Sequence, residues 1–374
     1  MIVLIAGGSG GHVFPAISVA QRLKNRNVPV VLLTDSRGMR FINERLHGDL
    51  FQKIYILPKG LDLFSKYRFF KTLDVMWTSL RALMYSRQLF KILKPTVLCG
   101  FGGRMSGIPL LWAHFFAKSS SGLKPRTAIH QSDRIMGLAN RILSRFVSVV
   151  FTSYPDTKRV PKRVSAIVVG TPIREEFFLP FKREAPFPLI VAVLGGSRGA
   201  DFWTDLLPKA LSRLSWEERR RLFLVHHALE SKVSILKEAY EDLKIRAHVT
   251  PFLPQIWDVL TKSHLALTRA GASSIAELIQ SRCPAFFVPY PYATDQHQLL
   301  NAQFLENHQA GWVFLQNDLQ PQDLARFLSK CIRDTKILEK ASLSMKALAP
   351  EDSAEKMVHF LLSNPREIHA QYPS

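Results

Sequence analysis

His12 is the first residue in the chain whose type and setting could do chemistry, because it ends the glycine-rich run Gly7–His12. A histidine at the mouth of such a turn can take a proton from an incoming hydroxyl, since its unperturbed pKa lies near neutrality. It could equally serve only to hold the loop or cap a helix. The apolar run Ile2–Ala6 predicts a strand before the turn, and a helix is predicted to open at Pro15, where the missing amide proton costs nothing.

A second unit of similar design begins with the strand-like run Leu189–Leu194 and continues through glycines to Ala200. A strand, glycine turn and helix aim backbone amides and the positive end of a helix dipole at one spot, which suits an anion. The first turn is not a complete dinucleotide fingerprint, because Val13 stands where the last glycine belongs, although Asp35 lies where a ribose-binding acid would sit. Two such units predict two facing nucleotide-fold domains with a cleft between them.

Glu277 is a second candidate for chemistry, in the stretch from Leu265 to Glu277 that reads as strand, small-residue turn and helix. Ser273 or Ser274 is expected near the helix cap. Glu277 then falls in the first turn or just beyond it, where a carboxylate can accept both hydroxyls of a ribose. This stretch is the strongest local signal in the chain.

A polar cluster follows the next strand-like run. Its members are Asp295, His297, Gln298 and Asn301. Carboxylate and amide groups gathered at the carboxyl end of a strand predict a reader of sugar hydroxyls. Capping or surface polarity would explain any one of them, but not the whole set.

Strand-like runs and helical patterns alternate along both halves, which predicts an α/β fold with two doubly wound parallel sheets. The strands of the first half are expected at 2–6, 28–33, 96–100, 127–130, 147–152 and 166–170, and those of the second at 189–194, 222–226, 247–250, 265–268, 285–288 and 313–315. The expected domains are 1–172 and 189–349, joined by a linker at 173–188, with a C-terminal helix at about 350–365 that packs back on the first domain.

The net charge of +20 belongs to one half of the chain. Residues 1–172 hold 26 Lys and Arg against 7 Asp and Glu, whereas residues 173–374 hold 24 against 23. Such asymmetry points to a polyanionic partner, either nucleic acid or an anionic membrane surface. The stretch 54–94 mixes aromatic and aliphatic residues with Lys and Arg, as an interfacial membrane element does. A helix packed on the sheet with a solvated basic face is the alternative.

Nucleic acid is not expected as a partner, because the aromatics of this basic region group with aliphatics and form no base-stacking platform. No apolar run approaches the roughly 20 residues of a membrane span. Three widely spaced cysteines fit a reduced cytosol, and the first residues have no basic region typical of a secretory signal.

Six motifs, in order and spacing, resemble the UDP-N-acetylglucosamine transferases of peptidoglycan synthesis. They are GGSGGHVFPA at 7–16, FGGRMSGIP at 101–109, GTPIR at 170–174, GGSRGA at 195–200, RAGASSIAEL at 269–278 and DQHQLLNA at 295–302. The resemblance implies two Rossmann-like domains facing a cleft, the GT-B glycosyltransferase architecture. It also implies inverting transfer of GlcNAc from UDP-GlcNAc to undecaprenyl-diphospho-muramoylpentapeptide (lipid I), which forms lipid II.

The resemblance assigns residues to the two substrates. For the donor, Arg174 and Ser197 would meet the diphosphate, Phe252, Leu253 and Ile256 would line the uracil pocket, Ala272, Ser273, Ser274, Ile275, Ala276 and Glu277 would hold phosphate and ribose, and Asp133, His297 and Gln298 would lie at the sugar. Ser9, Gly10, Gly11 and His12 would face the acceptor, with His12 the candidate general base. No cofactor or metal is expected, and the chain has no Asp-x-Asp pair for a divalent ion.

The same resemblance implies a peripheral enzyme on the cytoplasmic face of the inner membrane. Its expected partners are the undecaprenyl-linked acceptor, the anionic membrane surface and other proteins of cell-wall synthesis. The chain departs from the family pattern in three places. His130-Gln-Ser-Asp133 replaces His-Glu-Gln-Asn, so three of its four residues differ. Thr171 replaces the linker Asn, and Arg104 stands at a common aromatic position. These departures leave two alternatives open, transfer to diacylglycerol or another lipid and a non-catalytic membrane scaffold.

Overall fold

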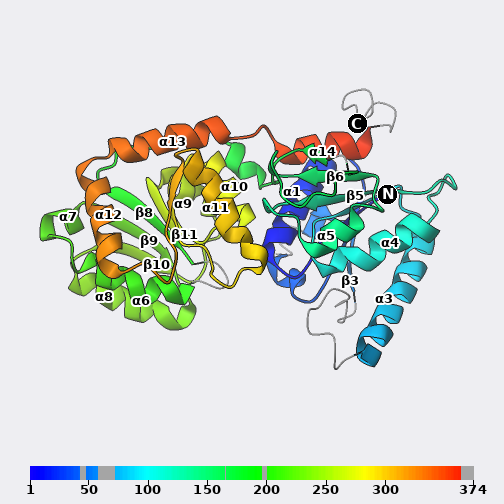
Figure 1. Ribbon diagram of the computed structural model, residues 1–374, viewed down its shortest axis with the longest axis horizontal. Helices are drawn as coiled ribbons and strands as arrows, with labels where there is room; N and C mark the ends of the chain where they lie inside the picture. Colours follow the sequence, from blue (N-terminus) through cyan, green and yellow to red (C-terminus); the bar gives the residue numbers. More distant parts are fainter. Residues whose placement is uncertain (43–47, 58–71, 165, 196–199, 364–374) are drawn as a thin grey trace. The chain divides into compact units, whose positions relative to one another are not determined.

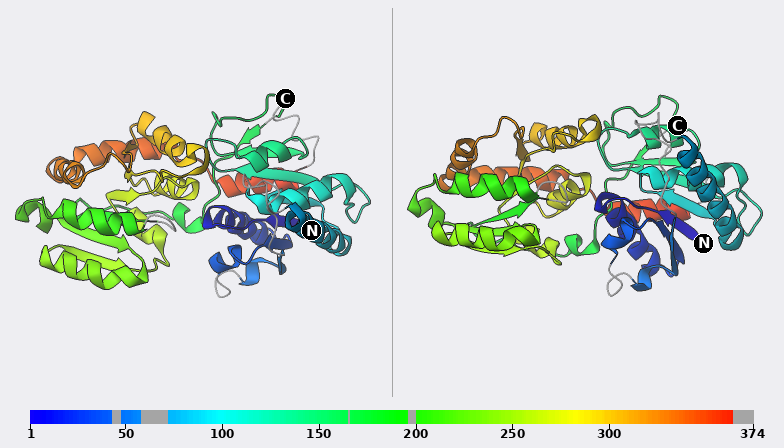
Figure 2. Two further views of the ribbon diagram at one scale, coloured as in Figure 1. Left: turned by 60° about the horizontal axis from the view of Figure 1, so that its bottom comes forward. Right: turned by 90° about the horizontal axis from the view of Figure 1, so that it is seen from below.

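The chain folds into two units, which we describe separately. The computed structural model describes residues 1–42, 48–57, 72–164, 166–195 and 200–363. The first unit comprises residues 1–174 together with the chain from Glu351 onward, and the second comprises Glu175–Pro350 (Figure 1). Each unit has a parallel sheet with helices on both faces (Figure 2).

The described strands of the first unit form one parallel sheet of seven. In spatial order they are β3 (Lys53–Ile56), β2 (Val30–Thr34), β1 (Ile2–Ile5), β4 (Val97–Gly100), β5 (Arg126–Gln131), β6 (Val149–Thr152) and β7 (Ala166–Val168). The chain order reverses between β1 and β4. In a sheet of this kind a ligand binds outside the carboxyl ends of the strands at such a reversal.

The pleat of β1 divides the core of this unit into two layers. Ile2 and Leu4 pack with the side of the sheet covered by α1 (Gly10–Asn25) and α14 (Ser353–Leu362), whereas Val3 and Ile5 pack on the opposite side. The opposite side carries α3 (Thr72–Leu93), α4 (Gly107–Phe116) and α5 (Leu138–Leu143). The C-terminal helix α14 is fixed to α1 by an ion pair of 2.7 Å between Arg22 and Asp352.

The second unit has a sheet of six described strands. In spatial order they are β10 (Arg246–Thr250), β9 (Leu222–His227), β8 (Leu189–Leu194), β11 (Leu265–Thr268), β12 (Ala285–Phe287) and β13 (Gly311–Val313). The order reverses between β8 and β11. The helices are α6 (Ala200–Leu211), α7 (Trp216–Arg220), α8 (Val233–Asp242), α9 (Ile256–Lys262), α10 (Ala272–Gln280), α11 (His297–Asn307), α12 (Pro321–Arg333) and α13 (Lys336–Leu348).

Much of the segment expected to be a linker packs on the second unit. Arg183 is the clearest case, because its guanidinium donates to the carbonyls of Leu260, Ser281 and Arg282 at the ends of α9 and α10. A side chain held by so many acceptors fixes the segment after Glu175 to its own unit. The segment that joins the two units after β7 is therefore shorter than the expected linker at 173–188.

Three expectations about elements were wrong. The strand β3 was missed, since its residues are exposed or half-buried at the sheet edge and show no buried apolar run. The last strand, expected at 313–315, lies at Gly311–Val313, where Gly311 lets the backbone approach β12. The third is the start of α1, described below. Among the described helices none is long and apolar enough to cross a membrane.

Candidate active site

The first glycine turn lies at the reversal point of the first sheet, after β1. The helix α1 begins at Gly10, because the amides of His12 and Val13 both donate to the carbonyl of Ser9. Pro15 therefore lies inside the helix, and the expected start at Pro15 was wrong. Ser9 is the N-cap residue and is exposed, although its side chain makes no capping hydrogen bond. Ser9, Gly10 and Gly11 therefore form the amino terminus of α1, where Ser9 is exposed and the two glycines are half-buried.

His12 lies in the first turn of α1, between two glycine turns. Its Nδ1 is 3.1 Å from the carbonyl oxygen of Gly7. A carbonyl can only accept, so Nδ1 carries the proton and the neutral ring keeps its lone pair on Nε2. The ring also lies against Gly102 and Gly103, where an added Cβ would come within 3.3 and 3.2 Å of it. Because neither glycine has a Cβ, the turn after β4 leaves room for the imidazole. Both glycines also have positive φ, which favours glycine at these positions.

Asp35 supports the same turn from the end of β2. Its Oδ1 accepts from the amides of Gly8 at 2.9 Å and Gly38 at 2.7 Å. A Cβ at Gly7 would lie 2.9 Å from that oxygen, which explains the glycine at this position. The sequence placed Asp35 where a ribose-binding acid would sit, but here the buried carboxylate ties the glycine turn to the neighbouring strand.

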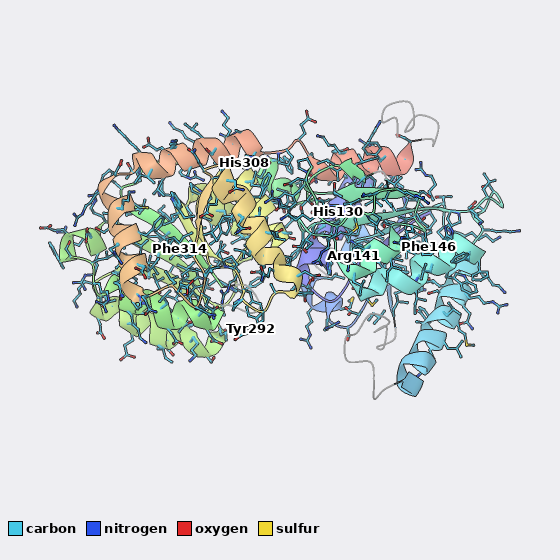
Figure 3. All side chains as sticks on the ribbon, viewed as in Figure 1. His130, Arg141, Phe146, Tyr292, His308 and Phe314 are labelled. Atoms are coloured by element: carbon cyan, nitrogen blue, oxygen red, sulfur yellow. The ribbon has the colours of Figure 1, made fainter. Side chains whose placement is uncertain are left out.

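His130 lies at the carboxyl end of β5 and is buried (Figure 3). Burial lowers its pKa to about 4, so the ring is neutral at pH 7 and its Nε2 donates to the carbonyl of Gly170 at 2.9 Å. This side chain therefore has a structural role. His12, with a free lone pair, is the better-placed base.

The altered family motif has its own hydrogen-bond pattern. The amide of Gln131 donates to the carbonyls of Asp133 and Ile135, each at 3.0 Å, and its oxygen accepts from Asn140 at 2.9 Å. A carboxylate could not donate to the two carbonyls, so glutamine suits this loop. Asp133 is half-buried on the loop that Gln131 holds.

Arg174 and Thr171 lie on the segment that follows β7. The Arg174 guanidinium lies over the ring of Phe14 from α1, with Cζ 5.4 Å from the ring centroid. Thr171 is buried and its hydroxyl is 2.6 Å from that of Ser153. Arg174 is thus anchored beside the first glycine turn, within the first unit.

In the second unit, the turn before α10 is the candidate anion site. The N-cap of α10 is Gly271, which has no side chain to accept from the first amides. Ser273 and Ser274 are the second and third residues of the helix and are half-buried, so neither is the cap. The turn after β8 that contains Ser197 lies outside the described residues.

Glu277 is the sixth residue of α10, in the second turn of the helix, and is half-buried. Ile275 is buried, and its amide donates to the carbonyl of Gly271. The ligand contact expected of Ile275 stays a prediction. Ala272 and Ala276 lie at the start and in the second turn of the same helix.

The loop before α11 fixes two of the expected sugar readers. His297 Nδ1 is 2.8 Å from the carbonyl of Thr294, so its proton is on Nδ1. The Gln298 oxygen accepts from the amide of Tyr290 at 2.9 Å, which leaves the NH2 group of Gln298 to donate. Tyr292, exposed on this loop, is labelled in Figure 3.

Asn301 lies about one turn after His297 on the same helix. It is buried, and its Nδ2 donates to the carbonyl of Ala270 at 3.3 Å. Asn301 therefore ties α11 to the turn before α10. Its expected part in reading sugar hydroxyls stays a prediction.

The residues expected at uracil follow β10. Phe252 is 68% exposed, and its carbonyl accepts from the Thr250 hydroxyl at 2.9 Å. Leu253 and Ile256 are half-buried, with Ile256 the first residue of α9. A flat ring can therefore stack at this edge of the second unit.

Within the described residues, no group of three or more His, Cys, Asp or Glu side chains could hold a metal ion. The three cysteines are free and buried. Burial raises the pKa of the Cys283 thiol to about 11, so this thiol is not a nucleophile at neutral pH.

Both halves of the chain match one class of enzyme domain. Residues 2–152 match the glycosyltransferase family 28 N-terminal domain, and residues 190–357 match the glycosyltransferase family 28 C-terminal domain. The two matches fall on the two sheets. The fold and the candidate site are therefore those of a two-domain glycosyltransferase of this class.

Individual relatives narrow this class. The UDP-N-acetylglucosamine–N-acetylmuramyl-(pentapeptide) pyrophosphoryl-undecaprenol N-acetylglucosamine transferase of Rhodospirillum centenum is 33% identical over 368 residues, covering 96% of this chain and 93% of the relative. The Bartonella henselae enzyme of the same name is 32% identical, covering 92% and 89%. The crystal structure of Acinetobacter baumannii MurG is similar with a TM-score of 0.75 and 26% identity, covering 96% and 98%. The chain belongs to this family of N-acetylglucosamine transferases.

Proposed function

We propose that this protein transfers GlcNAc from UDP-GlcNAc to the muramoyl 4-hydroxyl of lipid I and so forms lipid II. Family membership over nearly the full length of the relatives supports this activity. Two observations support it, one in each unit: the imidazole of His12 is oriented by the Gly7 carbonyl, and α10 begins at Gly271, which has no side chain to cap it. The first suits a hydroxyl nucleophile and the second a nucleoside diphosphate.

His12 is the proposed general base. Its Nδ1–H is held by the Gly7 carbonyl, so Nε2 can take the proton of the attacking hydroxyl. The acceptor oxygen forms a bond to the anomeric carbon while the bond from that carbon to the UDP oxygen breaks, and the configuration inverts. Ser9, Gly10 and Gly11 at the amino terminus of α1 are assigned to the diphosphate of the acceptor.

The leaving UDP gains negative charge as its bond to the sugar breaks. The amino terminus of α10, at Ala272, Ser273 and Ser274, is assigned to its diphosphate, since amides and the helix dipole stabilise that charge. Arg174 and Ser197 are assigned to the same group. No divalent ion is needed for the charge in this proposal.

The remaining donor contacts are assigned residue by residue from the family resemblance and from the hydrogen bonds of the loop before α11. Glu277 is assigned to the two ribose hydroxyls, with Ala276 beside it, and Phe252, Leu253 and Ile256 to uracil. His297 has its Nε2 lone pair available to a sugar hydroxyl, while the Gln298 NH2 group can donate to the sugar. Asp133 is assigned to the region of the donor sugar and, as a carboxylate, would accept from its hydroxyls.

The test is radiolabelled sugar transfer from UDP-GlcNAc to a lipid I analogue in EDTA, with diacylglycerol as a parallel acceptor. We expect transfer to the lipid I analogue and none to diacylglycerol. Transfer to diacylglycerol alone would move the protein to membrane glycolipid synthesis. UDP binding with no transfer to either acceptor would favour a non-catalytic scaffold.

A membrane-binding surface is the second part of the proposal. The end of α3 exposes Ile92 at 76%, and the end of α4 and the loop after it expose Phe116 at 64% and Leu123 at 70%. The helices α3 and α4 pack against each other, so these elements are neighbours. Nearby basic residues are Arg87, Lys91, Lys94, Lys118 and Lys124.

Apolar side chains among basic ones suit an anionic bilayer surface, because burial and attraction to headgroups add. We therefore place the protein on the cytoplasmic face of the inner membrane, where other cell-wall synthesis proteins are candidate partners. Part of the stretch 54–94 does not serve this purpose, since Lys53–Ile56 form β3 and Leu57 is buried. Residues 58–71 lie outside the described residues.

Sedimentation with anionic vesicles tests this surface. Ile92→Glu should reduce binding, and higher salt should weaken it further. Ile235→Glu is the matched control, because Ile235 is 54% exposed on α8 in the second unit. Equal binding by both variants, or binding indifferent to salt, would contradict the assignment.

A further inference from the structure

Arg269 is a buried cation at the carboxyl edge of the second sheet. It follows β11 directly and is only 8% exposed. Its Nη1 donates to the carbonyl of Val288 at 2.9 Å, just after β12, and its Nη2 donates to Gln316 Oε1 at 2.6 Å, beyond β13. Its Cζ lies 4.8 Å from the ring centroid of Phe202, in the first turn of α6. One side chain therefore contacts segments that follow β8, β12 and β13.

The charge of Arg269 has no carboxylate partner within the described part of the chain. Its partners there are carbonyls, one amide oxygen and the rings of Phe202 and Tyr290. Its Nε is buried without a hydrogen-bond partner in the same part of the chain. Burial lowers the pKa of Arg269, but a guanidinium stays protonated at neutral pH. A buried charge without a counter-charge is costly unless an anion compensates it.

The candidate anion site next to it in the sequence is the amino terminus of α10, whose cap Gly271 is two residues from Arg269. The loop after β12, which Arg269 holds through Val288 and Pro289, leads to His297 and Gln298. Arg269 is thus close in sequence to the proposed phosphate position, and its side chain holds the loop that leads to the proposed sugar readers. Neither contact requires Arg269 to touch the ligand.

We propose that Arg269 is a positioning residue of the donor site, whose buried charge serves as the counter-charge for the diphosphate of a nucleoside diphosphate sugar bound at α10. The proposal rests on the proposed function for the identity of the donor. It predicts a contribution that depends on the charge of the ligand. A residue that only braces the loops would contribute equally to charged and uncharged ligands.

The test measures the dissociation constants of UDP and uridine for the full chain by calorimetry or competition. Arg269→Met should raise the Kd of UDP about tenfold, which is the effect expected of unit charges roughly 12 Å apart at an effective dielectric constant of about 20, and should raise that of uridine much less. Arg269→Lys keeps the charge and should retain most of the preference for UDP over uridine. Parallel losses for both ligands in Arg269→Met would overturn the proposal.

Arg183 supplies a matched control in the same unit. It too is a largely buried arginine held by carbonyls, but it lies at the carboxyl ends of α9 and α10. Arg183→Met should lower the melting temperature and leave the ratio of the two dissociation constants unchanged. An equal change in that ratio would also overturn the proposal.

Two further outcomes can be distinguished from a failure of this proposal: a variant that does not fold, and a failure of the proposed function. If Arg269→Met does not fold, Arg269→Lys and Gln316→Ala decide, since both keep the charge and should keep the preference for UDP. A loss of that preference in either variant counts against the role of charge. If the unaltered chain binds neither UDP nor uridine, it is the proposed function that fails.

Discussion

The turns at the reversal points of the two sheets differ in what occupies them. In the first unit the turn is occupied by the protein's own side chains, with the His12 ring against Gly102 and Gly103 and the Asp35 carboxylate on the Gly8 amide. In the second unit the turn before α10 has Gly271, which lacks a side chain, as its cap, and the nearby Arg269 is held by the carbonyl of Val288.

This difference shows how one backbone design serves two kinds of chemistry. A turn occupied by an oriented imidazole suits proton transfer, whereas a turn with an uncovered helix start suits an anion. The difference predicts that changes in the first turn alter turnover, and that changes in the second alter donor affinity. The variants below are ordered from the largest expected effect to the smallest.

Replacement of His12 should give the largest effect. His12→Ala removes the proposed base and should lower kcat by about 10²–10⁴-fold, with the Kd of UDP unchanged. His359→Ala is the control, because His359 is at an exposed position of α14 in the same unit and has no assigned role at the site. A loss of UDP affinity equal to the loss of turnover would remove the distinction between the two turns.

Glu277→Ala should act on donor affinity and leave the chemical step intact. Two charge-assisted hydrogen bonds would be lost, each contributing at most about 1.5–3 kcal/mol. The same variant should lose most of the preference for UDP over its 2′-deoxy analogue, measured by calorimetry. Glu238→Ala, at an exposed position of α8, controls for the change in net charge. Unchanged UDP affinity in Glu277→Ala would refute the ribose assignment.

The pair Gly103→Ala and Gly122→Ala separates backbone strain from crowding of His12. Both glycines have positive φ, so either alanine should lower the free energy of unfolding by about 1–2 kcal/mol. Only Gly103 lies against the His12 ring, whereas a Cβ at Gly122 meets nothing within 4 Å. We therefore expect similar losses of stability, with a fall in kcat for Gly103→Ala alone. Equal turnover in both variants would mean that the ring adjusts freely.

The last contrast should leave turnover and donor affinity unchanged and concerns only stability as the pH is lowered. Burial lowers the pKa of His130 in the first unit to about 4 and that of His226 in the second to about 3. The unfolded chain therefore binds protons more readily below about pH 6.5, so stability is lost as the pH falls from there toward 4. Each histidine contributes a slope of at most about 1.4 kcal/mol per pH unit.

Urea unfolding between pH 4 and pH 7.5 measures this slope. His226→Gln should flatten it by the share of one histidine. His308→Gln, at an exposed position of the same unit, is the matched control. The same slope in His226→Gln and in the unaltered chain would show that His226 does not titrate on unfolding.

Much of the fold could be predicted from local pattern. The bounds of β8 and β11 match the expected ranges, because central strands covered on both faces are unbroken apolar runs. The edge strand β3 has no such run and was missed. The predicted start of α1 at Pro15 was wrong because the helix begins with Gly10 and Gly11, which have low helix propensity.

The chemistry of the candidate site divides in the same way. Residue type and spacing alone selected His12, Glu277 and the helix start before Glu277, because these signals lie within one strand–turn–helix unit. Tertiary structure alone decided that Asp35 holds a glycine turn, that Asn301 ties α11 to Ala270, and that Arg269 is a buried cation. Each of these roles depends on a partner from another strand or helix. Such contacts form only when the parallel sheet brings the carboxyl ends of its strands together, so no local pattern in the sequence encodes them.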